Sequence, residues 1–305
     1  MRIAVTGLTG QVVRALAERA EERGDEVIAI GRPQLDLAMP DAVAGALDRA
    51  FCGAMPDAVV SAAAYTAVDR AESEADLAMT INAKGAAAVA AWAHGHLLPV
   101  VHLSTDYVFD GAKATPYDED DAVAPQGAYG ASKLAGEQAV MAAHPGAVIL
   151  RTAWVYSPFG HNFVKTMLRL AQDRDEIGVV ADQIGNPTSA LDIADGVLDI
   201  IEALTSHPGA TPRGVFHMTA AGEASWADFA RAIFAASAAQ GGPVAQVRAI
   251  ATADYPTPAQ RPANSRLDCG FLAMAYGVRL PDWRAALPTV VARILTETAR
   301  PEHVA

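Results

Sequence analysis

Short apolar runs alternate with amphipathic stretches through the first half of the chain. Short apolar runs are typical of strands buried in a sheet. The stretches between them carry apolar residues at helical spacing, as Leu16, Ala17 and Ala20 do ahead of Gly24. The pattern predicts strands at 2–6, 26–30, 57–62, 99–103 and 147–152, with helices between them at 40–50, at 73–93 and from residue 129. This alternation predicts a parallel sheet with right-handed crossovers.

The regular alternation of strands and helices ends after Ser157. We expect helices near 160–172, 190–204, 225–239 and 284–298, and short strands near 177–181, 214–218 and 245–250. The segment 255–266 carries three prolines and two arginines, and we predict an ordered loop there. The whole pattern predicts an α/β protein with a Rossmann-type doubly wound parallel sheet in residues 1–156. A smaller mixed α/β domain follows in residues 157–305, and some of its segments return to the first domain.

Composition narrows the functional class. The 305 residues carry a formal net charge of −12, which argues against a nucleic-acid surface because phosphate binding needs clustered cations. The same charge disfavours an anionic membrane, and no apolar run is long enough to span a bilayer. The N-terminus runs straight into a strand without a signal-peptide pattern, and Cys52 and Cys269 are widely separated thiols that suit a reducing compartment. We therefore expect a cytoplasmic protein.

A glycine turn follows the first predicted strand and precedes a helix. Gly7 and Gly10 lie in this turn, and glycines let the backbone approach a pyrophosphate while the N–H groups of the helix N-terminus face it. Position 13, where a small residue would let helix and strand pack closely, is valine. Val13 should push the helix slightly away or force compensation nearby. The turn predicts that residues 1–156 form a dinucleotide-binding domain.

The end of the second strand bears on the choice of cofactor. A site that prefers NAD usually has a carboxylate there for the ribose hydroxyls, but this chain has Gly31 and Arg32. Arginine suits a 2′-phosphate, so we expect NADPH, with NADH as a second candidate. A solvated loop arginine is an equally good interpretation of Arg32. Asp36 and Leu37 follow, in positions to flank an adenine ring.

Small and hydroxylic residues follow the third and fourth strands. Ala63, Ala64 and Tyr65 come after the third strand, where small side chains let a cofactor lie against the backbone, although alanine is frequent throughout. Asn82, inside the next predicted helix, fits a bond to a neighbouring backbone better than catalysis. Thr105 follows the fourth strand. Ligands of open parallel sheets sit at the carboxyl ends of strands, so its hydroxyl is a candidate to bind a substrate carbonyl.

Tyr129 and Lys133 lie on one face at the start of the next predicted helix. A nearby cation favours the phenolate and lowers a tyrosine pKa from its ordinary value of about 10. Such a tyrosine can give a proton to a carbonyl oxygen as a hydride reaches the carbon. Taken alone, the pair also fits a half-buried tyrosine beside a solvated lysine.

Seven stretches carry a resemblance beyond these single positions. They are AAAYTAVDRAE at 62–72, STDYVF at 104–109, YGASKLAGE at 129–137, RTAWVY at 151–156, NFVKTM at 162–167, DQIGNPT at 182–188 and YPTPAQRPANSRL at 255–267. With the glycine turn, they resemble the extended short-chain dehydrogenase/reductase family. Over nearly the whole chain they are similar to its dTDP-4-dehydrorhamnose reductases. The last three stretches belong to the substrate half and are specific to that subfamily.

The resemblance implies NAD(P)H-dependent reduction of the 4-keto group of dTDP-4-dehydro-6-deoxy-L-mannose, giving dTDP-L-rhamnose. Tyr129 would donate the proton, Lys133 would lower the pKa of Tyr129 and hold the nicotinamide ribose, and Thr105 would hydrogen-bond the reacting oxygen. The residues expected to bind the cofactor are Gly7, Gly10, Gln11, Val12, Arg32, Asp36, Leu37, Ala63, Ala64, Tyr65, Tyr129 and Lys133.

The resemblance also implies a nucleotide-sugar site. Thr105, Asp106 and Trp154 would border the sugar, and Arg261 would bind the diphosphate, since a fixed cation fits phosphate geometry. A core aromatic is the plain alternative for Trp154, and a surface ion pair is the plain alternative for Arg261.

The chain departs from the family pattern at several positions. Val13 replaces a usual glycine, and Gly31 replaces an acidic residue, which favours NADPH. Some members form a dimer through glutamates that share a magnesium ion. The matching positions here are Ala15 and Leu191, which cannot ligate a hard cation. We therefore expect no metal site, and either a monomer or a homodimer.

Four other functions are considered, and the sequence disfavours two of them. A reductase that delivers hydride to the other face would give the talose-type C4 epimer, and a further variant would reduce another nucleotide keto-sugar. A dehydratase is disfavoured, because Tyr107 stands where dehydratases of this fold carry a glutamate. A non-catalytic NADP-binding regulatory subunit is disfavoured by the joint presence of Thr105, Tyr129 and Lys133.

Overall fold

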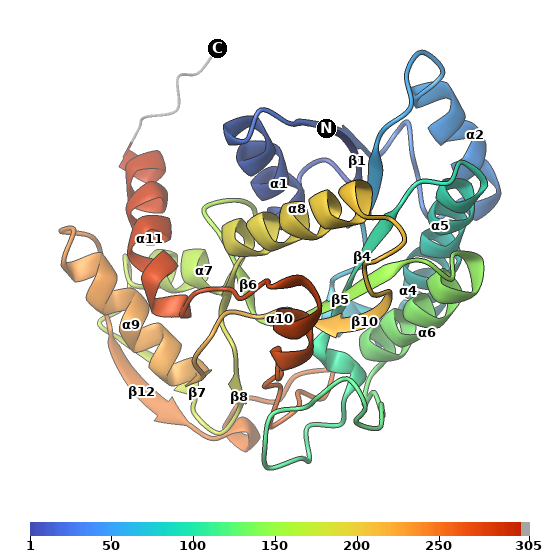
Figure 1. The fold of residues 1–305 in the computed structure, drawn as a ribbon. Helices are drawn as coiled ribbons and strands as arrows, with labels where there is room; N and C mark the ends of the chain where they lie inside the picture. Colours follow the sequence, from blue (N-terminus) through green and yellow to red (C-terminus); the bar gives the residue numbers. More distant parts are fainter. Residues whose placement is uncertain (300–305) are drawn as a thin grey trace.

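The centre of the molecule is a sheet of six parallel strands in the spatial order β10-β5-β4-β3-β1-β2 (Figure 1). The computed structural model describes residues 1–299. Its central strands are β1 (Arg2–Thr6), β2 (Glu26–Ile30), β3 (Ala58–Ser61), β4 (Val100–Thr105), β5 (Val148–Thr152) and β10 (Gly214–His217). The chain changes direction across the sheet between β1 and β3. In open α/β sheets, ligands bind outside the carboxyl ends of the strands at such a point.

Both faces of this sheet are buried, because successive residues of a strand point to opposite sides. Ile3 and Val5 of β1 join one apolar cluster, whereas Ala4 between them joins another. The helices that supply the first cluster are α1 (Gln11–Glu22) and α8 (Ala190–Ser206), and those that supply the second are α2 (Pro40–Ala50), α5 (Ala86–Gly95) and α6 (Ala128–Ala143). The predicted doubly wound parallel sheet is confirmed.

A smaller assembly lies beside the sheet and has an apolar cluster of its own (Figure 1). Its elements are α7 (Phe163–Leu170), α9 (Trp226–Ala238), α11 (Trp283–Ala299) and the parallel pair β7 (Glu176–Val180) and β12 (Gln246–Ile250). The helices and strands predicted after Ser157 are therefore confirmed within a few residues. Helix α10 (Gly270–Tyr276) is not predicted by the sequence pattern, because its seven residues are too few to show a helical period.

Two elements of the second half belong to the central layer. Helix α8 packs along α1, and β10 pairs with β5. Two short strand pairs connect the layers: β6 (Val155–Tyr156) with β9 (Thr188–Ser189), and β8 (Ile184–Gly185) with β11 (Ala224–Ser225). The loop at 255–266 is tied down by side chains, since Asn264 donates to the carbonyls of Lys113 and Thr115. The predicted ordered loop is confirmed.

The helix predicted at 73–93 is confirmed as one continuous helical stretch at 75–95, with a π-helical turn inside it. Its parts are α4 (Ala75–Met79), the π-helical turn (Thr80–Gly85) and α5, and a separate short helix, α3 (Val68–Ala71), precedes it. The wide turn carries Asn82 to the backbone of Tyr65, where its amide accepts from the N–H at 2.7 Å and donates to the carbonyl at 3.1 Å. The backbone role expected for Asn82 is confirmed, and the π-helical turn sets the direction of this side chain.

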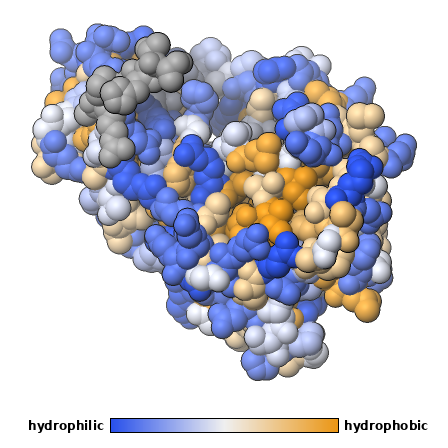
Figure 2. Space-filling model, turned by 90° about the horizontal axis from the view of Figure 1, so that it is seen from above, coloured by the Kyte–Doolittle hydropathy of each residue, from blue (hydrophilic) through white to orange (hydrophobic). Residues whose placement is uncertain are grey.

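The N-terminus and the start of β1 lie at the top of Figure 1, the side from which Figure 2 is seen. This face is mostly hydrophilic and has a hydrophobic hollow near its middle. On this side, Met1, Leu97, Pro99 and Leu204 line a shallow cavity of about 600 Å³. None of the helices within residues 1–299 combines the length and the apolar character that a bilayer-spanning segment requires.

Candidate active site

The first turn of α6 is pressed against the end of β4. Thr105 ends β4, and a 3₁₀ turn (Asp106–Val108) follows directly. Gly130 permits the contact, because a Cβ at this position would lie 2.2 Å from the carbonyl oxygen of Tyr107. The rings of Tyr107 and Tyr129 meet edge to face at 5.6 Å. The packing therefore brings Tyr129 to the carboxyl end of β4, beside Thr105, as the sequence predicts.

Burial is the main influence on the Tyr129 phenol. It raises the pKa to about 12, while hydrogen bonding with the Thr105 hydroxyl lowers it and the Asp106 carboxylate raises it. This direction is opposite to the lowering by Lys133 that the sequence predicts, because desolvation of the phenolate outweighs the favourable interactions. A tyrosine with this pKa is fully protonated at neutral pH, which is the state that a proton donor needs.

Lys133 is buried one helical turn beyond Tyr129. Its ammonium donates to the Leu103 carbonyl at 2.6 Å and lies 3.4 Å from His102 Nε2. Burial lowers the Lys133 pKa to about 8, and the nearby Glu137 carboxylate opposes this shift. Burial and the adjacent ammonium hold the pKa of His102 well below its usual range, so the imidazole is neutral. An ammonium has only donors, so His102 Nε2 accepts and Nδ1–H donates to Ser61 Oγ at 3.0 Å.

Arg151 and Glu137 form a buried ion pair near Lys133. Arg151 of β5 donates to both carboxylate oxygens of Glu137, from Nε at 2.9 Å and from Nη2 at 2.7 Å. Ser104 Oγ donates to the same carboxylate at 2.5 Å. Glu137 follows Lys133 by one helical turn, and Ser104 precedes Thr105. The pair therefore fixes α6 against β4 and β5 at the level of the site.

Asp106 is buried beside Thr105. The Thr105 hydroxyl donates to Asp106 Oδ1 at 2.9 Å, whereas Oδ2 is buried and has no hydrogen-bond partner among residues 1–299. Burial raises the pKa of Asp106 to about 7, and the hydrogen bond from Thr105 opposes the shift. The carboxyl therefore sits close to its titration point at neutral pH.

Trp154 follows β5 with a left-handed backbone, at φ +48°, which is rare for a bulky residue and is characteristic of functional sites. Its indole stacks on Trp226 with ring centroids 3.5 Å apart and nearly parallel planes. Its Nε1 donates to Ser265 Oγ at 2.9 Å. A Cβ at Gly185 would lie 2.4 Å from the indole, so only glycine fits there. Trp154 is thus held beside Trp226, which lines the cavity described below.

The glycine turn has the geometry of an anion site. Gly7 has φ +104°, and a Cβ there would lie 3.2 Å from Val13 Cγ2. The Val13 side chain therefore occupies space that Gly7 leaves free. This is the nearby compensation that we expected for a valine at this position. The helical ladder begins with the N–H of Arg14 bonded to the Gly10 carbonyl, which leaves the N–H groups before it at the open end of α1.

The side chain of Gln11 has a structural task. Its oxygen accepts from Ser157 Oγ at 2.8 Å and from Asn162 Nδ2 at 3.0 Å, and its amide nitrogen donates to the Val155 carbonyl at 3.3 Å. Gln11 thus connects the glycine turn with the segment after β5. Only its backbone N–H, with that of Val12, is left for a phosphate.

The other predicted cofactor residues lie at the same edge of the sheet. Arg32 is exposed just beyond β2, and a Cβ at Gly31 would lie 2.9 Å from Leu8. The Ala63 N–H donates to Thr6 Oγ1 at 2.9 Å, which holds the chain after β3 against the end of β1. The remaining positions are half-buried Asp36, buried Leu37, half-buried Ala64, and Tyr65, whose hydroxyl donates to Glu74 at 2.6 Å.

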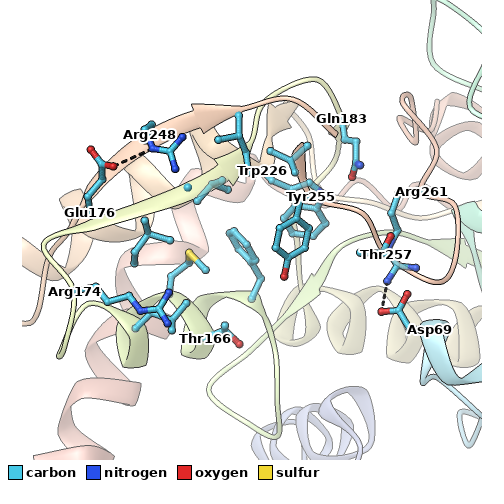
Figure 3. A pocket seen from close by; sticks show the side chains of 18 of the residues that line it. Asp69, Thr166, Arg174, Glu176, Gln183, Trp226, Arg248, Tyr255, Thr257 and Arg261 are labelled. Carbon is cyan, nitrogen blue, oxygen red and sulfur yellow. Dashed lines mark hydrogen bonds and ion pairs between the residues drawn. The ribbon is translucent and has the colours of Figure 1, made fainter. Parts of the chain in front are cut away.

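A cavity of about 580 Å³ lies between the two layers (Figure 3). Arg261 and Asp69 stand at one end and are joined by an ion pair of 2.8 Å, while Arg174, Arg248 and Glu176 stand at the other end. Nη1 of Arg261 is buried and has no hydrogen-bond partner in the described part of the chain. The Arg261 guanidinium, which the sequence predicts to bind the diphosphate, is therefore paired with Asp69 through Nη2, while Nη1 stays unpaired.

Sequence reasoning missed most of the cavity wall. The residues in question include Phe163, Thr166, Gln183, Trp226, Tyr255 and Thr257. They come from α7, α9 and the loops after β7 and β12. All but Trp226 lie in the stretches 162–167, 182–188 and 255–267, which the resemblance assigns to the substrate half without naming these residues. Within residues 1–299, no group of three or more His, Cys, Asp or Glu side chains is placed to hold a metal ion. Ala15 and Leu191 are both buried in the cluster between α1 and α8.

Comparisons with known proteins show which family the chain belongs to. Residues 1–296 match the family described as the RmlD substrate binding domain. A dTDP-4-dehydrorhamnose reductase of Sinorhizobium fredii is 51% identical over 298 residues, which cover 97% of this chain and 99% of the relative. The chain belongs to the dTDP-4-dehydrorhamnose reductase family.

Two further relatives are similar to this chain over most of its length. A crystal structure of the Bacillus anthracis dTDP-4-dehydrorhamnose reductase in complex with NADP has a TM-score of 0.85 and 35% identity, covering 95% of this chain and 98% of that chain. A Streptomyces antibioticus relative described as a probable dTDP-4,6-dihydroxy-2-methyloxan-3-one 4-ketoreductase is 42% identical, covering 94% of this chain and 93% of the relative.

Proposed function

We propose that this protein reduces the 4-keto group of dTDP-4-dehydro-6-deoxy-L-mannose to dTDP-L-rhamnose, with NADPH as hydride donor and NADH as a weaker one. The observation that carries the proposal is the meeting of a protonated, buried Tyr129 with the Thr105 hydroxyl at the carboxyl edge of the sheet. Family membership supports the same reaction.

Tyr129, Thr105 and Lys133 each have a role in the reaction. NADPH supplies the hydride when bound. Tyr129 gives its proton to the keto oxygen, and the Thr105 hydroxyl hydrogen-bonds the same oxygen as negative charge develops on it. The Lys133 ammonium has three N–H donors, of which one goes to Leu103 and one faces His102. The third is available for the nicotinamide ribose.

We assign the cofactor to the glycine turn and the neighbouring strand ends. Gly7 and Gly10 let the pyrophosphate approach, and the N–H groups of Gln11 and Val12 donate to it. The exposed Arg32 binds the 2′-phosphate. The other contacts come from Asp36, Leu37, Ala63, Ala64 and Tyr65. On this assignment residues 1–156 form the dinucleotide-binding domain.

We assign the nucleotide sugar to the cavity between the layers. Nη1 of Arg261 binds the diphosphate, since a buried N–H without a partner is costly until an anion accepts from it. Asp106 and Trp154 border the sugar. Residues 157–305 supply most of this substrate-binding domain, while α8 and β10 return to the first sheet. Both cysteines are free thiols, which supports a reducing, cytoplasmic location for a monomer or homodimer.

A second candidate stays within the same chemistry. The similarity to a relative described as acting on another dTDP-linked ketone favours a different 4-keto sugar, or the talose-type epimer, as the alternative. Proton donation by Tyr129 would be unchanged, and only the pose of the sugar would differ.

The test is NADPH oxidation by the purified protein with dTDP-4-dehydro-6-deoxy-L-mannose, for the wild type and Tyr129→Phe. We expect the variant to lose about 10²- to 10⁴-fold in kcat, because the proton donor is gone, and to bind NADPH as before. Tyr276→Phe is the matched control, since its hydroxyl donates to the Pro212 carbonyl far from the site.

The identity of the product separates the candidates. dTDP-L-rhamnose supports the proposal, and the C4 epimer moves the assignment to the second candidate. Turnover that survives in Tyr129→Phe would remove Tyr129 from the role of proton donor. Tight NADPH binding without turnover of any dTDP-4-keto sugar would favour a regulatory subunit.

A further inference from the structure

Gln11 serves both candidate sites through different parts of the residue. Its backbone N–H lies at the open end of α1, where we place the cofactor pyrophosphate. Its side chain turns to the segment after β5. There Nε2 donates to the Val155 carbonyl at 3.3 Å, and Oε1 accepts from Ser157 Oγ at 2.8 Å and from Asn162 Nδ2 at 3.0 Å. Two donors occupy the amide oxygen, so the orientation of the side chain is fixed.

Asn162 connects this amide with the wall of the substrate cavity. Its Nδ2 donates to Gln11, while its Oδ1 accepts from the N–H of Lys165 at 3.1 Å and so caps the N-terminus of α7. Phe163 and Thr166 lie in the first turn of α7, and both line the cavity (Figure 3). The position of this turn therefore depends on the position of the Gln11 amide.

The nitrogen of the same amide is tied to a second part of the wall. It donates to the carbonyl of Val155, the residue that follows Trp154. The Trp154 indole stacks on Trp226, which lines the cavity. One side chain from the glycine turn is thus bonded next to both the α7 side and the indole side of the cavity.

The bonds of Gln11 are separate from those that keep the loop after β6 folded. Ser157 Oγ and Asn162 Nδ2 also donate to the carbonyl of Phe159, at 2.9 and 3.2 Å. The Phe159 ring is buried, and the guanidinium of Arg14 on α1 lies 4.3 Å from its centroid. Loss of the Gln11 bonds therefore leaves the loop attached to α1 and removes only its alignment with the glycine turn.

We propose that Gln11 is a positioning residue that couples the cofactor site to the nucleotide-sugar cavity, so that each ligand binds more tightly when the other is present. The inference rests on the proposed function, which assigns the two ligands to these sites, and it deepens that function. Gln11 acts on the sugar side only through Asn162, Ser157 and Val155, so it is not a catalytic residue.

The coupling follows from where each bond acts. A phosphate bound to the N–H of Gln11 restrains the first turn of α1, and the amide passes this restraint to the cap of α7. The cavity wall is then already ordered when the nucleotide sugar arrives, so the second ligand loses less conformational entropy on binding. Thermodynamic linkage makes the effect reciprocal, and each ligand must tighten the other by the same factor.

The test is Gln11→Met, which keeps the length of the side chain, removes its hydrogen bonds and leaves the backbone N–H for the phosphate. Titrations with NADP⁺ and with dTDP, each alone and in the presence of the other, give the dissociation constants. For the wild type we expect each ligand to tighten the other at least about fivefold. For Gln11→Met we expect unchanged constants for each ligand alone, and a coupling factor within about twofold of unity.

Gln240→Met is the matched control. The amide of Gln240 also donates to a backbone carbonyl of another helix, that of Pro288 in α11, and neither residue lines the cavity or the glycine turn. This variant should keep the wild-type coupling factor.

Asn162→Ser tests the same link from the other side. Serine caps a helix as well as asparagine does, so α7 keeps its start, but serine has no amide to donate to Gln11. The coupling factor should fall in this variant as well. Wild-type coupling in Gln11→Met or Asn162→Ser would overturn the proposal, as would a wild type without coupling. Weaker binding of each ligand alone by Gln11→Met, with the coupling factor intact, would give Gln11 a structural role only.

Amide hydrogen exchange needs no nucleotide sugar and keeps this inference separate from the proposed function. NADP⁺ should slow the exchange of the Lys165 and Thr166 N–H groups, which bond to Asn162, in the wild type and not in Gln11→Met. Equal slowing in both proteins, or none in the wild type, would exclude the coupling. If the wild type shows this protection but does not oxidise NADPH with the dTDP-sugar, the proposed function fails and the link from Gln11 to α7 stands.

Discussion

Replacing Glu137 by glutamine should destabilise the protein strongly. The side chains of Glu137 and Arg151 are only 4% and 5% exposed, and the carboxylate accepts both guanidinium bonds. Glutamine keeps the shape but removes the charge, so the Arg151 cation stays buried without compensation. Breaking a buried pair in this way costs about 3–5 kcal/mol, and the oxygen that glutamine retains places this variant near 3.

Thermal unfolding measures this cost. For a protein of this size each kcal/mol lowers Tm by about 2 °C, so Glu137→Gln should unfold on the order of 6 °C below the wild type. Ser104→Ala is the matched control, because it removes one bond to the same carboxylate and leaves the ion pair intact. It should cost only about 1 kcal/mol.

The double variant Glu137→Gln/Arg151→Met isolates the pair. Removing both charges should be less destabilising than the sum of the two single changes, since no uncompensated charge stays buried. A Glu137→Gln variant within about 1 kcal/mol of the wild type, or strictly additive changes, would refute the reasoning. The same variant should lower the pKa of Lys133 further, because the Glu137 carboxylate raises it. The alkaline limb of activity should then shift to lower pH.

Two further changes test other parts of the structure. Arg32→Ala should weaken NADPH binding about tenfold, the effect of losing about 1.5 kcal/mol of charge-assisted bonding, and leave NADH binding nearly unchanged. Fluorescence titration with both cofactors measures this, and equal losses for the two would remove Arg32 from the 2′-phosphate. Asp192→Asn should stabilise the protein by about 1 kcal/mol at neutral pH, because burial raises the Asp192 pKa to about 6 and Oδ2 has no partner within residues 1–299. The folded state holds that proton between pH 3.8 and about 6, so wild-type stability falls as pH rises through this window. Denaturation curves for the variant should lack that fall.

The sequence predicts the parts of the site that depend on local pattern. Strand ends and helix starts placed Thr105 and Tyr129 at one edge, and the helical period put Lys133 on the same face. The pKa of Tyr129 follows from desolvation, which depends on the contact of α6 with the end of β4, so sequence reasoning gave the wrong direction. The π-helical turn at Asn82 accompanies a contact with the backbone of Tyr65, which the local sequence pattern does not reveal.

The cavity wall and the accommodation of Val13 illustrate the same limit. Trp226 and Gln183 line one cavity only after α9 and the loop following β7 have packed together. Val13 fits because Gly7, six residues earlier, leaves space over the turn. Both relations are steric complementarities between side chains, and hydrophobic periodicity carries no information on them.

The stacked indoles also limit how this chain can diverge. Trp154 fills the space over Gly185 on one side and lies on Trp226 on another, so the three positions form one steric unit drawn from distant parts of the chain. A larger residue at 185 is compatible only with a smaller one at 154, and the loss of the indole at 154 leaves Trp226 without its stacking partner. Substitutions at these three positions are therefore expected to be inherited together, and a single change at any of them to be an evolutionary dead end.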